Sequence, residues 1–107
     1  MMTEPVYAIA QIDVKDLNTY ITDYGLPLLE MFDKIGAEVL AATDEATVLE
    51  GERSGNWTVI IKFPSLEAAQ NWYQSEDYAP LRKARIERLS NSGMVMLVPG
   101  FDPSLLG

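Results

Sequence analysis

The sequence has 107 residues, of which 48% are hydrophobic and 22% charged, and this is the size and composition of one globular domain. It contains no cysteine and no histidine, which excludes disulfides, Cys/His zinc sites, cysteine nucleophiles, histidine-ligated haem and Ser-His-Asp triads. The net charge of −8 argues against a nucleic-acid partner, because polyanions are bound by Lys and Arg.

The first predicted element is a β-strand over residues 6–14, whose alternation gives it two distinct faces. One face carries Val6, Ala8, Ala10, Ile12 and Val14. The sequence has no basic n-region and no apolar stretch of about 20 residues. We therefore expect neither a signal peptide nor a membrane anchor, and we expect a cytoplasmic protein.

Residues 16–35 predict a helix, with Asp16 placed to cap it by accepting a hydrogen bond from a backbone amide. One apolar stripe follows at three- and four-residue spacing: Leu17, Tyr20, Ile21, Tyr24, Leu28, Met31, Phe32 and Ile35. Gly25 and Pro27 predict a kink or break inside the pattern. Gly36 is expected to end the helix in a left-handed conformation.

Two strands separated by a turn follow this helix. Residues 38–50 are predicted as a strand that is interrupted at residues 43–45. Residues 51–56 form a turn rich in Gly, Ser and Asn. Residues 57–63 are β-branched and aromatic, and they give the strongest strand signal of the chain.

The second helix is predicted to begin after Ser65, which is expected to cap it. The helical pattern restarts at Ser75 and continues to Leu89. A turn at residues 92–93 leads into a last strand over residues 94–98. We expect residues 1–100 to form a single domain and residues 101–107 to form a C-terminal arm.

The later part of this helical region is basic, although the chain as a whole is acidic. Residues 80–90 contain Arg82, Lys83, Arg85 and Arg88 against a single acidic residue, Glu87. Either these side chains form a solvated helix face, or one arginine points inward and binds an anion.

The predicted order of elements is β-α-β-β-α-β. This order is typical of an α+β, ferredoxin-like fold, in which a four-stranded antiparallel sheet has both helices on one face. The other face would be largely apolar: Tyr7, Ile9 and Ile60, with either Val95 and Leu97 or Met94 and Met96, although Gln11, Thr58 and Lys62 share it. Because such a patch usually marks a partner surface, we expect a homodimer that pairs through this open sheet face.

Residues 49–85 read LEGERSGNWTVIIKFPSLEAAQNWYQSEDYAPLRKAR. The pieces that stand out are Glu50-Gly51, Phe63-Pro64-Ser65, Ala69, Trp72-Tyr73, Ser75, Tyr78 and Arg85. This pattern resembles an uncharacterised bacterial family, domain of unknown function 1330, of the dimeric α/β-barrel (ferredoxin-like) superfamily. The similarity runs from about Val6 to Gly100, and Tyr20 and Tyr24 suit the tyrosines of that family's first helix.

The sequence departs from the family pattern at two positions. Lys62 stands where the family often has Glu, and Ala37 stands where it often has a second Gly. The resemblance implies the ferredoxin-like fold and pairing as a dimeric α/β barrel. It implies little chemistry, because the wider superfamily includes cofactor-independent monooxygenases, muconolactone-type isomerases and haem peroxidases.

Glu50 and Arg85 are the candidate catalytic residues. A partly buried glutamate can act as a general acid or base, although Glu50 could instead bond backbone amides or pair with Arg53. Arg85 shares an apolar stripe with Tyr78 and Leu81, and a buried guanidinium needs a partner. We expect that partner to be Glu50, with a bound carboxylate as the alternative.

The candidate ligand-binding residues are Tyr20, Trp72, Tyr73, Ser75 and Tyr78. Aromatic rings can pack against a ligand while tyrosine hydroxyls orient it, but the same spacing is typical of ordinary core, which we expect for Trp72. Ser75 also fits a helix cap. We expect no metal and no cofactor, because no carboxylate spacing resembles a calcium loop and no phosphate-binding glycine motif occurs.

Two functions follow from these residues. The first is a small-molecule-pocket protein that could be a cofactor-free enzyme on an organic acid or an aromatic metabolite, with Glu50 as acid or base and Arg85 as anion clamp. The second is a non-catalytic dimeric module that binds a ligand or serves as a scaffold. The second predicts a fully paired polar interior and no cavity of several hundred Å³. A haem peroxidase ranks third, because the iron would need a tyrosinate or carboxylate ligand.

Overall fold

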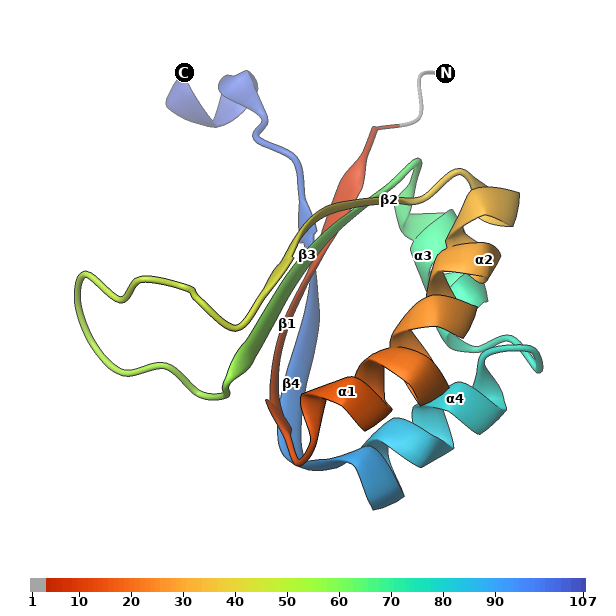
Figure 1. Ribbon diagram of the computed structural model, residues 1–107. Helices are drawn as coiled ribbons and strands as arrows, with labels where there is room; N and C mark the ends of the chain where they lie inside the picture. The colour runs from red at the N-terminus through yellow and green to blue at the C-terminus, as the bar shows by residue number, and fades with distance from the viewer. Residues whose placement is uncertain (1–3) are drawn as a thin grey trace.

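The computed structural model describes residues 4–107, in which one antiparallel sheet is covered by helices on a single face (Figure 1). The strands lie in the order β2-β3-β1-β4. Their bounds are β1 Val6–Val14, β2 Glu38–Thr43, β3 Trp57–Phe63 and β4 Ser90–Pro99. The structure confirms the predicted α+β, ferredoxin-like fold. No helix within residues 4–107 is long and apolar enough to cross a membrane.

Strand β1 shows why one face of the sheet becomes core. Its residues alternate strictly between buried and half-buried positions, as the sequence pattern predicts. On the buried face, Ala8 lies opposite Ile61 of β3 and Leu97 of β4, and Ala10 lies opposite Val59 and Val95. Because alanine fills little volume, the middle of the sheet leaves space beneath the helices.

The first helical region runs without a break across this face. It consists of α1 (Leu17–Tyr20), a π-helical turn η1 (Ile21–Gly25) and α2 (Leu26–Ile35). The predicted interruption is therefore a wider helical turn, and Gly25 keeps right-handed helical angles (φ −63°, ψ −48°). Gly36 ends the helix at φ 75°, which confirms the left-handed cap.

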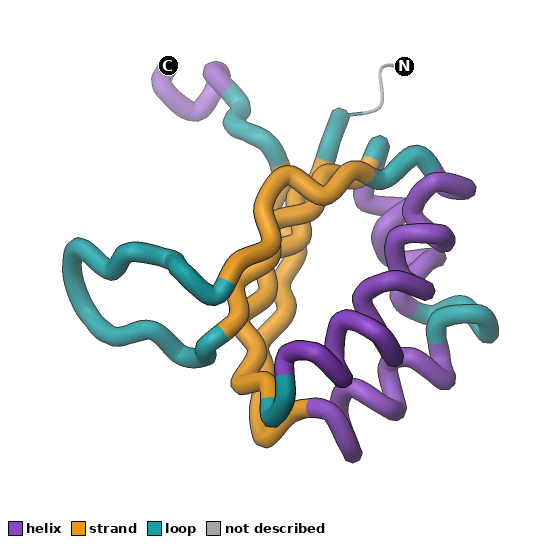
Figure 2. Tube along the Cα trace, viewed as in Figure 1, coloured by secondary structure: helices purple, strands orange, loops and turns teal. Residues whose placement is uncertain are grey.

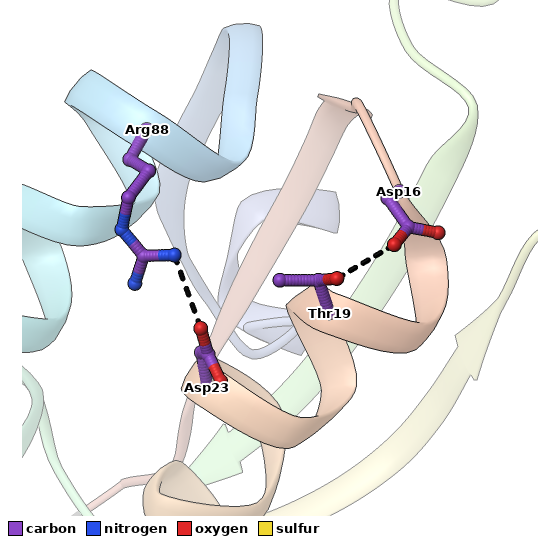
Figure 3. Close-up of polar contacts among 4 residues, drawn as sticks. All are labelled: Asp16, Thr19, Asp23 and Arg88. Carbon is purple, nitrogen blue, oxygen red and sulfur yellow. Dashed lines mark hydrogen bonds and ion pairs between the residues drawn. The ribbon is translucent and has the colours of Figure 1, made fainter.

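The predicted capping role of Asp16 is wrong. Its carboxylate accepts a hydrogen bond of 2.6 Å from the hydroxyl of Thr19 (Figure 3) and none from a backbone amide. Thr19 lies three residues after Asp16, at the position whose backbone amide a capping residue would bind. Its hydroxyl binds the Asp16 carboxylate in place of that amide. Ser65 does cap α3, because its hydroxyl accepts a bond from the amide of Ala68 at 3.0 Å.

Strand β2 ends at Thr43, earlier than the predicted residue 50. The residues after it form a long loop, which Figure 2 shows extending from the sheet on the side away from the helices. Two contacts to β1 hold the base of this loop. Gln11 accepts bonds from the amide and hydroxyl of Ser54, and the side chain of Asn56 bonds both backbone groups of Val14.

The second helical region contains α3 (Leu66–Tyr73), α4 (Ala79–Ala84) and a π-helical turn η2 (Arg85–Leu89). Strand β4 then begins at Ser90, so the predicted turn at residues 92–93 is wrong. The reason is that Gly93 and Ser92 pair with Ile12 and Asp13 and extend the ladder to the end of β1. A short 3₁₀ turn, η3 (Pro103–Leu106), lies near the C-terminus.

The open face of the sheet carries the methionines of β4. Met94 lies opposite Gln11 and Met96 lies opposite Ile9, with 37% and 48% of their surfaces exposed. Val95 and Leu97 face the helices. The open face therefore carries Met94 and Met96 and not Val95 and Leu97, a choice that the alternation of the sequence left open.

Candidate functional site

The core between helices and sheet contains a cluster of tyrosines. Tyr20, Tyr24 and Tyr78 are all buried, and the hydroxyls of Tyr24 and Tyr78 share a hydrogen bond of 2.6 Å. The ring of Tyr20 lies 4.9 Å from that of Tyr24, and the ring of Tyr78 lies 4.2 Å from that of Trp72, measured between centroids. The helices therefore bring together three of the predicted ligand-binding residues.

Arg85 lies beside this cluster at the start of η2, with only 5% of its surface exposed. Its Nε is buried and has no hydrogen-bond partner. Within residues 4–107, the sole ion pair joins Arg88 and Asp23 at 3.0 Å (Figure 3), so Arg85 has no carboxylate partner. The expected internal pair with Glu50 is wrong.

Glu50 does not line the site beside Arg85. It is exposed in the loop between β2 and β3, because the strand that was expected to carry it ends at Thr43. Arg53 lies in the same loop and makes one long contact, 3.5 Å from its Nη1 to the carbonyl of Ala46. The structure thus separates Glu50 from the tyrosines and from Arg85.

The other basic residues of the segment 80–90 are half-buried (Arg82) or exposed (Lys83 and Arg88). Arg82 donates a bond of 2.6 Å from its Nη1 to the carbonyl of Tyr73, and its guanidinium lies 5.1 Å from the centre of the Tyr73 ring. Arg88 pairs with Asp23. Of the four basic residues in this segment only Arg85 is buried, and its binding of an anion stays a prediction.

Burial affects the ionisation of the cluster. It raises the pKa of the Tyr20 and Tyr24 hydroxyls well above their usual range, although the positive charge of Arg85 opposes part of this shift. Burial lowers the pKa of Arg85, whereas the neighbouring Tyr24 and Tyr78 raise it by a larger amount. The net shift of this pKa is therefore upward. The site therefore holds a neutral Tyr20 and a neutral Tyr24 beside a charged guanidinium.

Three neighbouring cavities meet in this region. A central cavity of about 40 Å³ lies under the middle of the sheet, and Tyr20, Tyr24, Tyr78 and Arg85 line it. An edge groove of about 340 Å³ runs along the start of β4, and Arg85 lines it as well. An apolar pocket of about 200 Å³ lies between α2 and strands β2 and β3, with Tyr20 and Tyr24 again in its wall.

The remaining predicted site residues have separate places. Trp72 is buried, lines the central cavity, and has an Nε1 without a partner. Tyr73 lines the edge groove. Ser75 accepts a bond from the amide of Tyr78 and donates one to the carbonyl of Trp72, and it lines an outer groove of about 660 Å³ between α2 and α3.

The sequence-based selection of site residues omitted Tyr24. The apolar stripe of the first helix contains Tyr24, and Tyr20 and Tyr24 both suit the tyrosines of the family's first helix, but neither observation by itself indicates a binding role for Tyr24. A signal was nevertheless present, because Tyr24 follows Tyr20 by four residues and must lie on the same side of the helix. A second tyrosine at that spacing indicates two hydroxyls inside one core.

Comparisons with known proteins place this geometry in context. A family model described as "Domain of unknown function (DUF1330)" matches residues 5–101. No curated protein sequence matches the chain significantly.

The solved structures that resemble the chain share its fold. A protein of unknown function from Rhodopseudomonas palustris has a TM-score of 0.73 at 15% identity, covering 94% of this chain and 85% of its own. The methylated form of that protein has a TM-score of 0.75 at 13% identity, covering 94% and 84%. A candidate antibiotic biosynthesis monooxygenase from Bacteroides thetaiotaomicron has a TM-score of 0.53 at 14% identity, covering 92% and 90%. Identities this low show a common fold and carry no activity across.

Proposed function

Because this chain belongs to the DUF1330 family, whose description specifies no activity, we propose a function from the site itself: the protein binds a small organic anion between its helices and its sheet. The observation that carries the proposal is the buried Arg85 side chain, whose Nε has no hydrogen-bond partner and which pairs with no carboxylate within residues 4–107. A carboxylate matches a guanidinium in charge and can bind it through two parallel hydrogen bonds.

An unpaired charge in a protein interior costs several kcal/mol, so buried charges normally have a partner. Within residues 4–107 no carboxylate pairs with Arg85. A bound anion would supply the missing charge and the missing acceptor for Nε.

The hydroxyls of Tyr24 and Tyr78 support the same proposal. Two hydroxyls carry two protons, and the single bond between them uses one. One O–H donor is left, and burial keeps Tyr24 protonated. That donor is available to orient a ligand oxygen held by Arg85, which is a binding role and does not require Glu50.

Two further features favour a ligand-binding pocket over a scaffold without one. A scaffold would have a fully paired polar interior, yet Arg85 Nε and Trp72 Nε1 are both buried without partners. The site also adjoins cavities of about 200 and 340 Å³, which approach the size of small-molecule pockets.

We also propose that the protein acts as a homodimer. Tyr7, Ile9 and Ile60 lie on the open sheet face with the two exposed methionines of β4. A second copy of the same face would remove this apolar surface from water on both subunits at once.

Isothermal titration with a panel of small carboxylates, matched against their uncharged amides, tests the proposed function. We expect binding of one or more carboxylates by the wild type, at least tenfold weaker binding by Arg85→Lys, which loses the planar fork, and none detectable with Arg85→Met. The control is Arg88→Met, which removes the same charge from the exposed side of the same helical turn. Binding that is equal for acids and amides, or unchanged in Arg85→Met, would contradict the proposal.

A further inference from the structure

The apolar pocket between α2 and strands β2 and β3 is distinct in character from the edge groove at β4. Its wall is built from apolar and aromatic side chains, among them Leu28, Phe32, Val39 and Trp57, together with the hydroxyl-bearing Tyr20 and Tyr24. Its outer rim is exposed, since Leu26 and Leu29 on α2 are about half accessible. The pocket is therefore open to solvent on one side.

On its inner side this pocket leads to Arg85. Five residues form the wall of both the apolar pocket and the central cavity: Tyr20, Tyr24, Leu28, Val59 and Ile61. Arg85 and Val95 in turn line both the central cavity and the edge groove. The three spaces therefore adjoin one another across the sheet. The apolar pocket lies at one end, the central cavity with Tyr24 and Tyr78 lies in the middle, and Arg85 and the edge groove lie at the other end.

We propose that the ligand is an aryl-substituted carboxylic acid, with its ring in the apolar pocket and its carboxylate on Arg85. This inference rests on the proposed function and specifies the chemical class of the anion. The volumes agree with a ring and a short linker. A cavity of about 150 Å³ accommodates benzene, so the pocket of about 200 Å³ has room for a ring, and the central cavity of about 40 Å³ has room for one or two linker atoms.

The wall favours a ring over an alkyl chain. Tyr20 and Tyr24 are 4.9 Å apart and Tyr20 and Trp57 are 6.4 Å apart between ring centroids. Another aromatic ring placed among them would gain offset or edge-to-face contacts that an alkyl chain cannot make. Small residues keep the space free, because Ala42 of β2 and Gly25 of η1 both line the pocket.

The experiment compares acetate, 3-phenylpropanoate and 3-phenylpropan-1-ol by isothermal titration. With the wild type we expect 3-phenylpropanoate to bind at least about tenfold more tightly than acetate, because its ring leaves water. The uncharged alcohol, which keeps the ring and lacks the carboxylate, is expected to bind at least about tenfold more weakly than the acid. In spectra of the 3-phenylpropanoate complex, the methyl resonances of Leu28 and Val59 should shift.

A matched pair of variants locates the ring. Leu29→Gln places an amide in the rim of the apolar pocket and is expected to weaken 3-phenylpropanoate about fivefold to tenfold while acetate is unchanged. The control is Leu66→Gln at the start of α3, because Leu66 is exposed to the same extent as Leu29 (46% against 47%) and lines none of these cavities.

The outcomes separate this inference from the proposed function. Equal affinities for acetate and 3-phenylpropanoate, both lost in Arg85→Met, would overturn the aryl assignment and leave the anion site standing. Equal weakening of 3-phenylpropanoate by Leu29→Gln and by Leu66→Gln would also overturn the aryl assignment. Binding of the acid and the alcohol with equal affinity would overturn the proposed function. No binding of any of the three would overturn the aryl assignment, and if no member of the carboxylate panel binds either, the proposed function is overturned as well.

Discussion

Arg85 is the residue at which this chain departs from the rule that a buried charge has an opposite charge beside it. Its position could be predicted from the sequence, because it follows Tyr78 and Leu81 by seven and four residues on one helical stripe. Its partner could not be predicted. Whether Glu50 could reach it depended on where β2 ends, and local sequence defines strand ends poorly.

The tyrosines raise the pKa of Arg85 chiefly through their anionic form, which Tyr24 does not adopt near neutral pH. At that pH the buried charge has no ionised partner and should destabilise the unliganded protein. We therefore expect Arg85→Met, which keeps an apolar stem of similar length, to raise the free energy of unfolding by about 1–2 kcal/mol. Urea denaturation followed by fluorescence measures this change. The control Arg88→Met loses only an exposed ion pair and should change stability by less than about 1 kcal/mol. Lower stability of Arg85→Met would show that the guanidinium is already compensated.

The buried tyrosines predict a loss of stability at high pH. The pKa of Tyr20 and Tyr24 is raised in the folded state, so above the usual pKa of about 10 the unfolded chain releases protons that the folded chain keeps. Their contribution is fully present below about pH 10 and is lost as the pH rises toward the folded values. Each tyrosine adds a slope of up to about 1.4 kcal/mol per pH unit.

Urea denaturation at several pH values from about 9 to about 11.5 measures this slope. In Tyr20→Phe the fall in unfolding free energy should be shallower than in the wild type, because one of the two linked groups is gone. A slope that is the same in both proteins would contradict the assignment. Tyr73, which is only partly buried beside the edge groove, provides the control Tyr73→Phe.

At the scale of elements, most of the local rules held where the contacts are local. The alternation of β1, the left-handed Gly36 and the Ser65 cap all depend on residues within four positions of one another. The local exception is the Asp16 cap, which the hydroxyl of Thr19 replaces. The other failures are at strand ends that distant partners determine. Strand β4 starts early because Ser92 and Gly93 find pairing partners in β1, about 80 residues away in the sequence.

Two glycines predict opposite effects of the same substitution. At Gly55, which closes the loop between β2 and β3, an added methyl would lie 2.7 Å from backbone atoms of Ile12. Gly55→Ala should therefore lower the free energy of unfolding by about 1–3 kcal/mol. At Gly25, inside the helix, the nearest atom would be 4.0 Å away, and Gly25→Ala should raise it by up to about 1 kcal/mol. Thermal denaturation of the two variants checks both signs, and a loss of stability in Gly25→Ala or none in Gly55→Ala would contradict them.

At the scale of the whole molecule, the open sheet face determines the assembly that we propose. Light scattering on a sizing column should give the wild type about twice the chain mass of 11.9 kDa. Met96→Glu places a charge in the middle of the open face and should give the single-chain mass. Met96 is half exposed in one subunit, so the variant should still fold, which circular dichroism checks.

The matched control for this experiment is Leu66→Glu, an equally exposed leucine on the helical side. It should keep the double mass. A wild type of single-chain mass, or a Met96→Glu variant that stays double, would contradict pairing through this face.

The sequence by itself determined the fold and the aromatic character of the core, and it placed Arg85 on an apolar helical stripe, because hydrophobic periodicity and helix caps act over a few residues. The tertiary structure alone decided that Arg85 has no carboxylate partner, that Tyr24 and Tyr78 share a bond, and that an apolar pocket leads toward the charge. These facts depend on which segments meet across about 30 to 60 residues of chain. Contacts between distant segments follow from the packing of whole helices and strands. In that packing, a shift of one strand end moves a side chain from the core to solvent.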